Sequence, residues 1–380
     1  MAVPATSSTP FVLIPLHLSF ALSILRVESL RRLLAGSFRT LSLVPVLVTG
    51  CAGFIGYHVA DALLRRGESV LGVDSMNHYY DPALKEARVG RLADHDGFSL
   101  ERIDLSDRTV IDGLLDRGID RIVHLAAQAG VRHSIERPFD YLDANLAAHL
   151  TVLELARAIE SPHLVFASSS SVYGGNESLP FATDHAVDHP LSLYAATKRS
   201  GELMAHGYAR LYGIPTTGLR FFSVYGTWGR PDMALWRFAE AIREGRPIEL
   251  YNHGRHRRDF TWVGDVVDGI LRVLDRPAEP DPDFDPMSST PDRSDAPFRV
   301  YNLGNNSNVG LVRFVELIEQ AMGRSAEKVL LPKQPGDVEA SAADVAPMRR
   351  EFGWEPTTPV EVGVPAFIEW WREWIASRSR

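Results

Sequence analysis

The sequence predicts a parallel, doubly wound α/β sheet with a smaller C-terminal lobe, and three observations lead to this prediction. Short apolar runs rich in β-branched residues alternate with helical stretches from Leu43 onward, which is typical of a parallel sheet covered by helices on both faces. A glycine-rich turn at residues 50–56 joins the first apolar run to the first helical stretch. The 380 residues are 45% hydrophobic and 23% charged, which indicates a globular protein of one large or two coupled domains.

The expected elements follow in order along the chain. Strands are predicted at 44–50, at 69–74, shortly before Asp104, at 121–127 and at 163–170, with a helix at 57–67 between the first two. Residues 275–297 are rich in Pro, Asp and Ser and predict a loop. A strand at 300–304, a helix at 312–323 and a tryptophan-rich helix at 367–374 follow. We therefore expect a first domain over residues 43–222 and mostly a second lobe over residues 223–380.

The first 42 residues differ from the rest of the chain. Residues 11–25 form an apolar run, which is short for a membrane span of about 20 residues. No Lys or Arg precedes Phe11, whereas a signal peptide begins with a basic segment. We expect a dispensable extension, or a start codon assigned too early, on a cytoplasmic protein. The alternative is an amphipathic membrane anchor formed by residues 11–25.

Composition excludes several classes of function. A single cysteine, Cys51, excludes a disulfide scaffold and a cysteine-cluster metal site. A net charge of −8 gives no bulk attraction to nucleic acid. His185 and His189 have the spacing of metal ligands, but they lie in an expected loop that ends at Pro190, so no metal site is predicted.

The glycine-rich turn, Gly50-Cys51-Ala52-Gly53-Phe54-Ile55-Gly56, is the strongest local signal. Small residues allow the backbone to turn tightly against a pyrophosphate, whose charge is met by the first amides of the following helix. Asp74 ends the second strand 18 residues later, where a carboxylate accepts hydrogen bonds from the adenine ribose. Because that carboxylate repels a 2′-phosphate and no Arg follows it directly, NAD is favoured over NADP. The first domain is therefore predicted to be a Rossmann-type NAD-binding domain.

Asp104, after the third strand, is either an acceptor for the adenine amino group or a solvated turn residue. The residues expected to bind NAD come from the ends of these strands and from the helix that starts near Tyr194. They are Gly50, Gly53, Phe54, Ile55, Gly56, Asp74, Asn77, Asp104, Leu105, Leu125, Ala126, Ala127, Tyr194 and Lys198.

Tyr194 and Lys198 are spaced to lie on one face of a helix, one turn apart. A phenol has an ordinary pKa near 10 and is a poor base at neutral pH. A neighbouring ammonium and an oxidised nicotinamide both favour the phenolate. Ser168–Ser171 follow an apolar strand, which places hydroxyl groups at the carboxyl edge of the sheet, where ligands bind. Together these residues predict a catalytic site.

These motifs resemble the extended short-chain dehydrogenase/reductase superfamily, in particular its NAD-dependent epimerase/dehydratase family. Longer segments resemble the UDP-glucuronate 4-epimerases, and the resemblance extends from about Leu43 to the C-terminus. These segments are DSMNHYYDPALKEAR (74–88), AAQAGVRHSIERP (126–138), SLYAATKRSGELMA (192–205), LRFFSVYGTWGRPDMA (219–234) and NHGRHRRDFTWVGD (252–265).

The resemblance implies a role for each catalytic residue. Tyr194 would remove the proton of the sugar 4-hydroxyl, Lys198 would hold the nicotinamide ribose and lower the tyrosine pKa, and Ser169 would share the hydroxyl proton. NAD would take hydride from C4, the 4-keto sugar would rotate, and hydride would return to its other face. The resemblance also implies a homodimer joined through the long helices.

The resemblance implies a UDP-hexuronic acid as substrate, and the oxidised intermediate is then a β-keto acid that loses CO2 readily. Ser223 and Arg230 match the Thr and Arg that hold the substrate carboxylate in that family, and a guanidinium fork suits a planar carboxylate. Arg258 would meet the pyrophosphate and Asp337 the uridine ribose. The expected substrate-binding residues are Ser169, Ser170, Ser171, Tyr194, Ser223, Arg230, Arg258 and Asp337.

The chain departs from the family pattern at several positions, including Ser223, Thr227, Trp262, Gly264 and residues 336–344. These departures leave the fit to the substrate open. UDP-glucose 4-epimerase and UDP-glucuronate decarboxylase activities remain alternatives on the same scaffold, and a non-catalytic NAD-binding regulator is the alternative of another class. A 4,6-dehydratase is disfavoured, because Ser170 and Ser171 stand where such enzymes carry an Asp–Glu pair.

Overall fold

The computed structural model describes residues 44–334 and 336–378. The predicted extension, with its possible anchor at residues 11–25, lies outside these residues. Within the described ranges, no helix has both the length and the apolar character that a membrane crossing needs.

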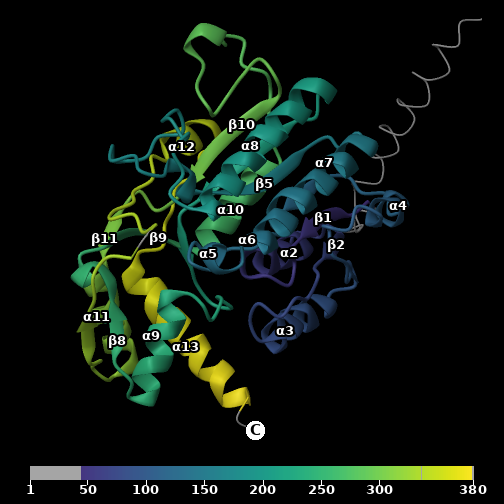
Figure 1. Ribbon diagram of the computed structural model, residues 1–380. Coiled ribbons are helices and arrows are strands. Elements are labelled where there is room, and N and C mark those ends of the chain that lie inside the picture. Colours follow the sequence, from purple (N-terminus) through teal and green to yellow (C-terminus); the bar gives the residue numbers. More distant parts are fainter. Residues whose placement is uncertain (1–43, 335, 379–380) are drawn as a thin grey trace, which may run out of the picture. The chain divides into compact units, whose positions relative to one another are not determined.

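A seven-stranded parallel sheet forms the centre of the larger part of the fold, as predicted (Figure 1). Its strand order is β10-β6-β5-β4-β1-β2-β3, so the direction of winding reverses between β1 and β4. In such sheets, ligands bind at the carboxyl edge beside this reversal. The strands are β1 (Val46–Thr49), β2 (Val70–Val73), β3 (Phe98–Glu101), β4 (Ile122–His124), β5 (Leu164–Ser169), β6 (Thr216–Phe221) and β10 (Phe298–Leu303).

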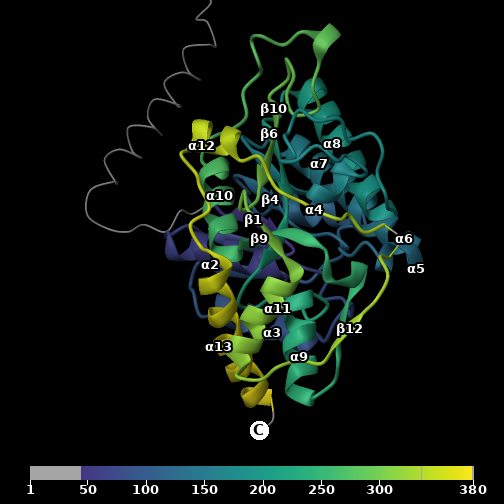
Figure 2. The ribbon, with the colours of Figure 1, turned by 90° about the vertical axis from the view of Figure 1, so that its left-hand side faces the viewer.

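Helices cover both faces of this sheet, because its strands are apolar on both sides. Val46 and Val48 of β1 pack with α2 (Phe54–Arg65) and α10 (Val263–Leu274). Leu47, between them, faces the opposite layer of α7 (Ala148–Ala158) and α8 (Leu193–Tyr212). Figure 2 shows these two layers on opposite sides of the strands. Further helices complete the layers: α3 (Pro82–Ala93), α4 (Val110–Leu115), α5 (His133–Glu136), α6 (Pro138–Leu142) and α12 (Ala346–Phe352).

The smaller lobe has its own core of aromatic and aliphatic side chains. A three-stranded sheet of order β11-β9-β7 and the pair β12-β8 lie beside helices α9, α11 and α13. The strands are β7 (Ser223–Tyr225), β8 (Ile248–Leu250), β9 (Arg257–Trp262), β11 (Asn308–Gly310) and β12 (Lys328–Leu330). The helices are α9 (Ala234–Glu244), α11 (Leu311–Met322) and α13 (Val360–Arg378).

The chain passes more than once between the part that contains the seven-stranded sheet and the smaller lobe. β7, β8 and β9 lie in the lobe, but the following helix α10 returns to pack on α2. β10 then pairs with β6 of the large sheet, from Phe298 opposite Thr216 to Leu303 opposite Phe221. The segment 275–297, expected as a loop, contains the short 3-10 turn Pro286–Ser288. Most residues after 222 lie in the lobe, but residues 263–274 and 298–303 pack with the large sheet and its helices.

Candidate active site

One cavity of about 920 Å³ opens at the carboxyl ends of the parallel strands and continues into the smaller lobe. All fourteen residues expected to bind NAD line it, which places the glycine turn and the Tyr–Lys pair in the same space. Of the residues expected to bind substrate, the lining includes Ser169, Tyr194, Ser223, Arg230, Arg258 and Asp337. Ser170 and Ser171 lie in the following 3-10 turn (Ser170–Tyr173) and do not belong to the lining.

The glycine turn is tight enough to require its glycines. Gly50 adopts a φ of +70°, and a Cβ on Gly56 would come within 2.1 Å of the Gly50 carbonyl oxygen. Helix α2 starts after Gly53, and no side chain among the described residues caps it. Gly53, Phe54 and Ile55, at the start of α2, line the cavity. The amides of this first turn suit an anionic group.

Asp74 is buried at the end of β2 and is fixed by two backbone amides. Its Oδ2 accepts from the Ala52 amide at 3.1 Å, and its Oδ1 accepts from the Met76 amide at 2.8 Å. Lys85 lies 3.6 Å from the same carboxylate and donates to Asn77 Oδ1 at 2.9 Å. Lys85 is a lining residue that sequence reasoning missed, although it lies in one of the resembling segments.

The two loops beside this site are held by local hydrogen bonds. Asp104 is exposed and accepts from the Ser106 amide at 2.9 Å, so it forms a turn and also lines the cavity. Thr49 Oγ1 accepts from the Leu125 and Ala126 amides, both at 3.1 Å. Thr49 therefore fixes the loop after β4, and sequence reasoning missed this role.

Tyr194 and Lys198 lie in the first turns of α8, which begins after the N-cap Ser192. The Ser192 hydroxyl accepts from the Ala195 amide at 3.1 Å. Lys198 is buried, and its Nζ donates to the Ala167 carbonyl at 3.0 Å. Burial lowers the pKa of Lys198 to about 8, because the charged form loses solvation.

The environment of Tyr194 differs in one respect from the expectation. Burial raises the pKa of Tyr194, while a hydrogen bond with Ser169 and the positive charge of Arg230 oppose this rise. Lys198, which was expected to lower the tyrosine pKa, instead donates to the backbone. Among the described residues, the positive charge of Arg230 is the one that lowers the pKa of Tyr194.

The serine run is divided between two tasks. Ser169 accepts from the Ser171 amide at 3.2 Å and from the Ser171 hydroxyl at 2.9 Å, so its own proton remains for Tyr194 or a ligand. Ser168 donates to Glu202 at 2.6 Å. Glu202 is fully buried and pairs with Arg220 at 2.9 Å, which anchors α8 to β6.

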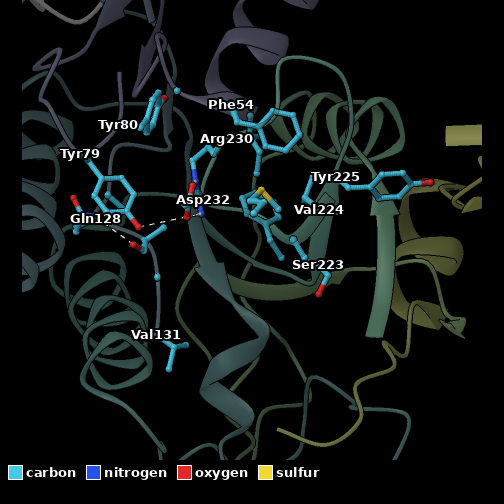
Figure 3. Close-up of a pocket in the computed structure, with 18 of the residues that line it drawn as sticks. Phe54, Tyr79, Tyr80, Gln128, Val131, Ser223, Val224, Tyr225, Arg230 and Asp232 are labelled. Carbon is cyan, nitrogen blue, oxygen red and sulfur yellow. Dashed lines mark hydrogen bonds and ion pairs between the residues drawn. The ribbon is translucent and has the colours of Figure 1, made fainter. Parts of the chain in front are cut away.

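Arg230 lines the same cavity as the glycine turn and pairs with a carboxylate of its own loop. Its Nε donates to Asp232 Oδ1 at 2.9 Å and its Nη2 to Oδ2 at 3.0 Å. Tyr79 also donates to Oδ2, at 3.4 Å. Figure 3 shows these three side chains together, with Ser223 further along the cavity. Asp232 and Tyr79 line the cavity and were missed as site residues.

The far end of the cavity, in the smaller lobe, is cationic around one carboxylate. Asp337 lies 3.5 Å from Arg132 and 3.6 Å from His256. Burial alone would raise the pKa of Asp337, but His256, Arg132 and Arg258 together lower it. Arg132 also stacks over the Tyr251 ring at 4.5 Å. Arg132, Tyr251 and His256 were not predicted as site residues.

Three departures from the family pattern, at Thr227, Trp262 and Gly264, lie outside this cavity. Trp262 and Gly264 are not lining residues, although both are described. A Cβ at Gly264 would lie 2.9 Å from Trp262 Nε1. The absence of a side chain at 264 therefore makes room for the indole at 262.

Comparisons with known proteins show which proteins the chain is similar to. A model of the "NAD dependent epimerase/dehydratase family" matches residues 46–286. The chain is 48% identical over 327 residues to a probable UDP-glucuronate 4-epimerase of Rhizobium meliloti, covering 86% of this chain and 96% of that one. It is 43% identical to UDP-glucuronate 4-epimerase 1 of Arabidopsis thaliana, covering 89% and 79%. The crystal structure of UDP-glucuronic acid 4-epimerase from Bacillus cereus with UDP-glucuronic acid and NAD is 30% identical, with a TM-score of 0.78 and coverage of 87% and 100%.

Proposed function

The chain belongs to the NAD dependent epimerase/dehydratase family, and from this premise we propose that it interconverts UDP-glucuronate and UDP-galacturonate by inverting C4. NAD is its cofactor, and when bound it supplies a reversible hydride acceptor. The glycine turn and Asp74 would hold it, because the turn excludes side chains and Asp74 is already fixed by two amides. The observation that carries the proposal is that Tyr194, Ser169 and Arg230 share one cavity with that turn.

In this proposal Tyr194 and Ser169 handle the proton of the 4-hydroxyl. Ser169 accepts two hydrogen bonds from Ser171, so its proton is directed toward Tyr194 or the sugar. Lys198, held by the Ala167 carbonyl, would hold the nicotinamide ribose. Ser170 and Ser171 stay predictions as direct substrate contacts, and Ser171 acts on the geometry of Ser169.

The remaining residues would bind the substrate at both ends. Arg230 and Ser223 face the sugar carboxylate, because both line the cavity and a guanidinium recognises a carboxylate by paired hydrogen bonds. Arg258 faces the pyrophosphate and Asp337 the uridine ribose, with Arg132 adding positive charge nearby. A neutral hexose would leave Arg230 without a carboxylate from the ligand, which disfavours UDP-glucose as the main substrate.

A homodimer is a second part of the proposal. Leu150 on α7 and Leu203, Leu211 and Tyr212 on α8 are exposed to solvent. Exposed apolar side chains on two adjacent helices suit a contact between subunits.

The experiment that tests the function is incubation of purified protein with UDP-glucuronate and no added NAD, followed by chromatography and mass spectrometry. We expect a second nucleotide sugar of unchanged mass that co-elutes with UDP-galacturonate. A product lighter by one CO2 would identify a decarboxylase instead. Turnover of UDP-glucose alone would identify a hexose epimerase, and NAD binding with no turnover of either sugar would indicate a regulator.

A further inference from the structure

Asp232 occupies one edge of the Arg230 guanidinium and leaves the other edge available. A guanidinium has five N–H groups in one plane. Asp232 accepts from Nε and from Nη2, at 2.9 and 3.0 Å. No residue in the described ranges accepts a hydrogen bond from Nη1. The edge formed by Nη1 and the second N–H of Nη2 can therefore take a second carboxylate.

The Arg230–Asp232 pair is also contacted by a residue of the first domain. Tyr79, in the segment between β2 and α3, donates to Asp232 Oδ2 at 3.4 Å. The Tyr79 ring in turn packs against His133, with ring centres 4.9 Å apart. Asp232 is therefore held by the arginine on one side and by the first domain on the other (Figure 3).

The loop that carries Arg230 is also tied to the glycine turn. Arg88 of α3 is fully buried. It donates to the Trp228 carbonyl at 2.6 Å and to the Ala52 carbonyl at 2.7 Å. The backbone just before Arg230 is thus connected to the turn expected to bind NAD, so the loop has a fixed position relative to the cofactor site. Within that loop, the two hydrogen bonds to Asp232 set the direction of the guanidinium plane.

The direction of this plane has a chemical consequence for a β-keto acid. If the C5–C6 bond aligns with the C4 ketone, its electron pair passes into the ketone, CO2 leaves and C5 takes a proton. A carboxylate held on a fixed guanidinium keeps the C5–C6 bond pointing in one direction, out of this alignment. A mobile guanidinium would hold the carboxylate less strictly.

We propose that Asp232, supported by Tyr79, is a positioning residue that fixes Arg230 so that its second edge holds the substrate carboxylate and prevents loss of CO2. This inference rests on the proposed function. It differs from a model in which Asp232 competes with the substrate for Arg230, because the two carboxylates would occupy different edges.

The test compares Asp232→Asn and Tyr79→Phe with the wild-type enzyme on UDP-glucuronate. Asn keeps the size of Asp but loses the charge and the paired acceptors. We expect Asp232→Asn to raise KM about tenfold and the ratio of decarboxylated product to UDP-galacturonate about tenfold, since hydrogen bonds to charged groups are strong. Tyr79→Phe is expected to shift the same ratio by a smaller factor, and Asp232→Glu to restore part of it.

Glu86→Gln is the matched control, because Glu86 accepts from both arms of Arg102, at 2.6 and 2.7 Å, outside the cavity. It should change neither KM nor the product ratio.

If Asp232→Asn folds and keeps the wild-type ratio and KM, the inference is wrong. If KM falls, Asp232 competes with the substrate and the inference is also wrong. If Asp232→Asn fails to fold, an unchanged ratio in Tyr79→Phe overturns it. Absence of UDP-galacturonate with the wild-type enzyme would overturn the proposed function as well.

Discussion

Tyr194 is the residue on which the proposed chemistry depends most directly. It lies in the cavity with Ser169 and within the field of Arg230. Replacement by Phe removes the hydroxyl and keeps the ring. We expect kcat to fall by about 10³-fold, in the range of general acid–base catalysis, with KM for UDP-glucuronate changed only a few-fold. Steady-state kinetics of Tyr194→Phe measures both quantities.

Tyr212→Phe is the control for this change, because Tyr212 lies at the exposed end of the same helix. It should leave kcat unchanged. A Tyr194→Phe enzyme that keeps more than a tenth of the wild-type kcat would show that another group carries the proton.

At this scale the sequence predicts residue types better than their partners. The spacing of Tyr194 and Lys198 on one helical face can be read from the chain, because it is local. The partner of Lys198 is a backbone carbonyl of β5, and the cation near Tyr194 comes from a loop 36 residues later, Arg230. Neither contact has a sequence pattern, since both depend on how separate elements pack. Asp232 was missed for the same reason.

The long helix α8 is the element on which the proposed dimer can be tested. Leu203 is 57% exposed near its middle. A Glu at this position would place a charge in an apolar contact between subunits, where desolvation is costly. We expect Leu203→Glu to shift the protein from dimer to monomer, as measured by sedimentation velocity, without a loss of helical signal in circular dichroism.

Leu330→Glu is a matched control, because Leu330 is 56% exposed on β12 in the smaller lobe. It should leave the sedimentation coefficient unchanged. A wild-type protein that sediments as a monomer would contradict the proposed dimer directly.

The strands of the large sheet and the helix α2 were predictable because their patterns of apolar residues are strong. β1, β2, β4 and β5 lie within the predicted runs, and α2 overlaps the predicted helix 57–67. The lobe was harder to predict. Its strands β7, β8, β11 and β12 have three residues each, too few for an alternating pattern to appear. These strands form through their partners rather than through local preference.

At the scale of the whole molecule, the return of β10 to the large sheet is the feature that the sequence did not indicate. Residues 300–304 were expected to form a strand, but nothing local states that it pairs with β6, more than 70 residues earlier. The composition of the segment 275–297 predicts a loop, but it does not predict to which sheet the chain returns after that loop. The same long-range pairing returns residues 298–303, which follow the predicted boundary at residue 222, to the large sheet.

Acid stability is a property of the whole molecule that follows from its buried histidines. Burial lowers the pKa of His58, His149 and His163 to about 4, and that of His124 well below its ordinary value. The folded state keeps them neutral, whereas the unfolded chain binds protons below about pH 6.5. Their contribution to stability is therefore fully present above pH 6.5 and is lost as the pH falls from 6.5 toward 4.

His163 allows this prediction to be tested away from the active site. Its Nδ1 lies 3.2 Å from the Leu274 carbonyl and its Nε2 lies 3.0 Å from the Thr217 hydroxyl. A Gln can both donate and accept in this place without binding a proton. From pH 7 to pH 5, we expect the unfolding free energy of His163→Gln to fall by about 2 kcal/mol less than that of the wild type.

Urea unfolding at the two pH values, with the NAD concentration held constant, measures this difference. His189→Gln is the control, because His189 is exposed and its replacement should leave the pH dependence of the wild type unchanged. Parallel loss of stability in His163→Gln and the wild type would mean that His163 is not kept neutral by the fold. The acid sensitivity would then come from carboxylates such as Glu202, whose pKa the buried Arg220 and Ser168 keep low against the effect of burial. Stability carried by such a group is lost at lower pH, as Glu202 becomes protonated, so the pH at which stability falls distinguishes the two origins.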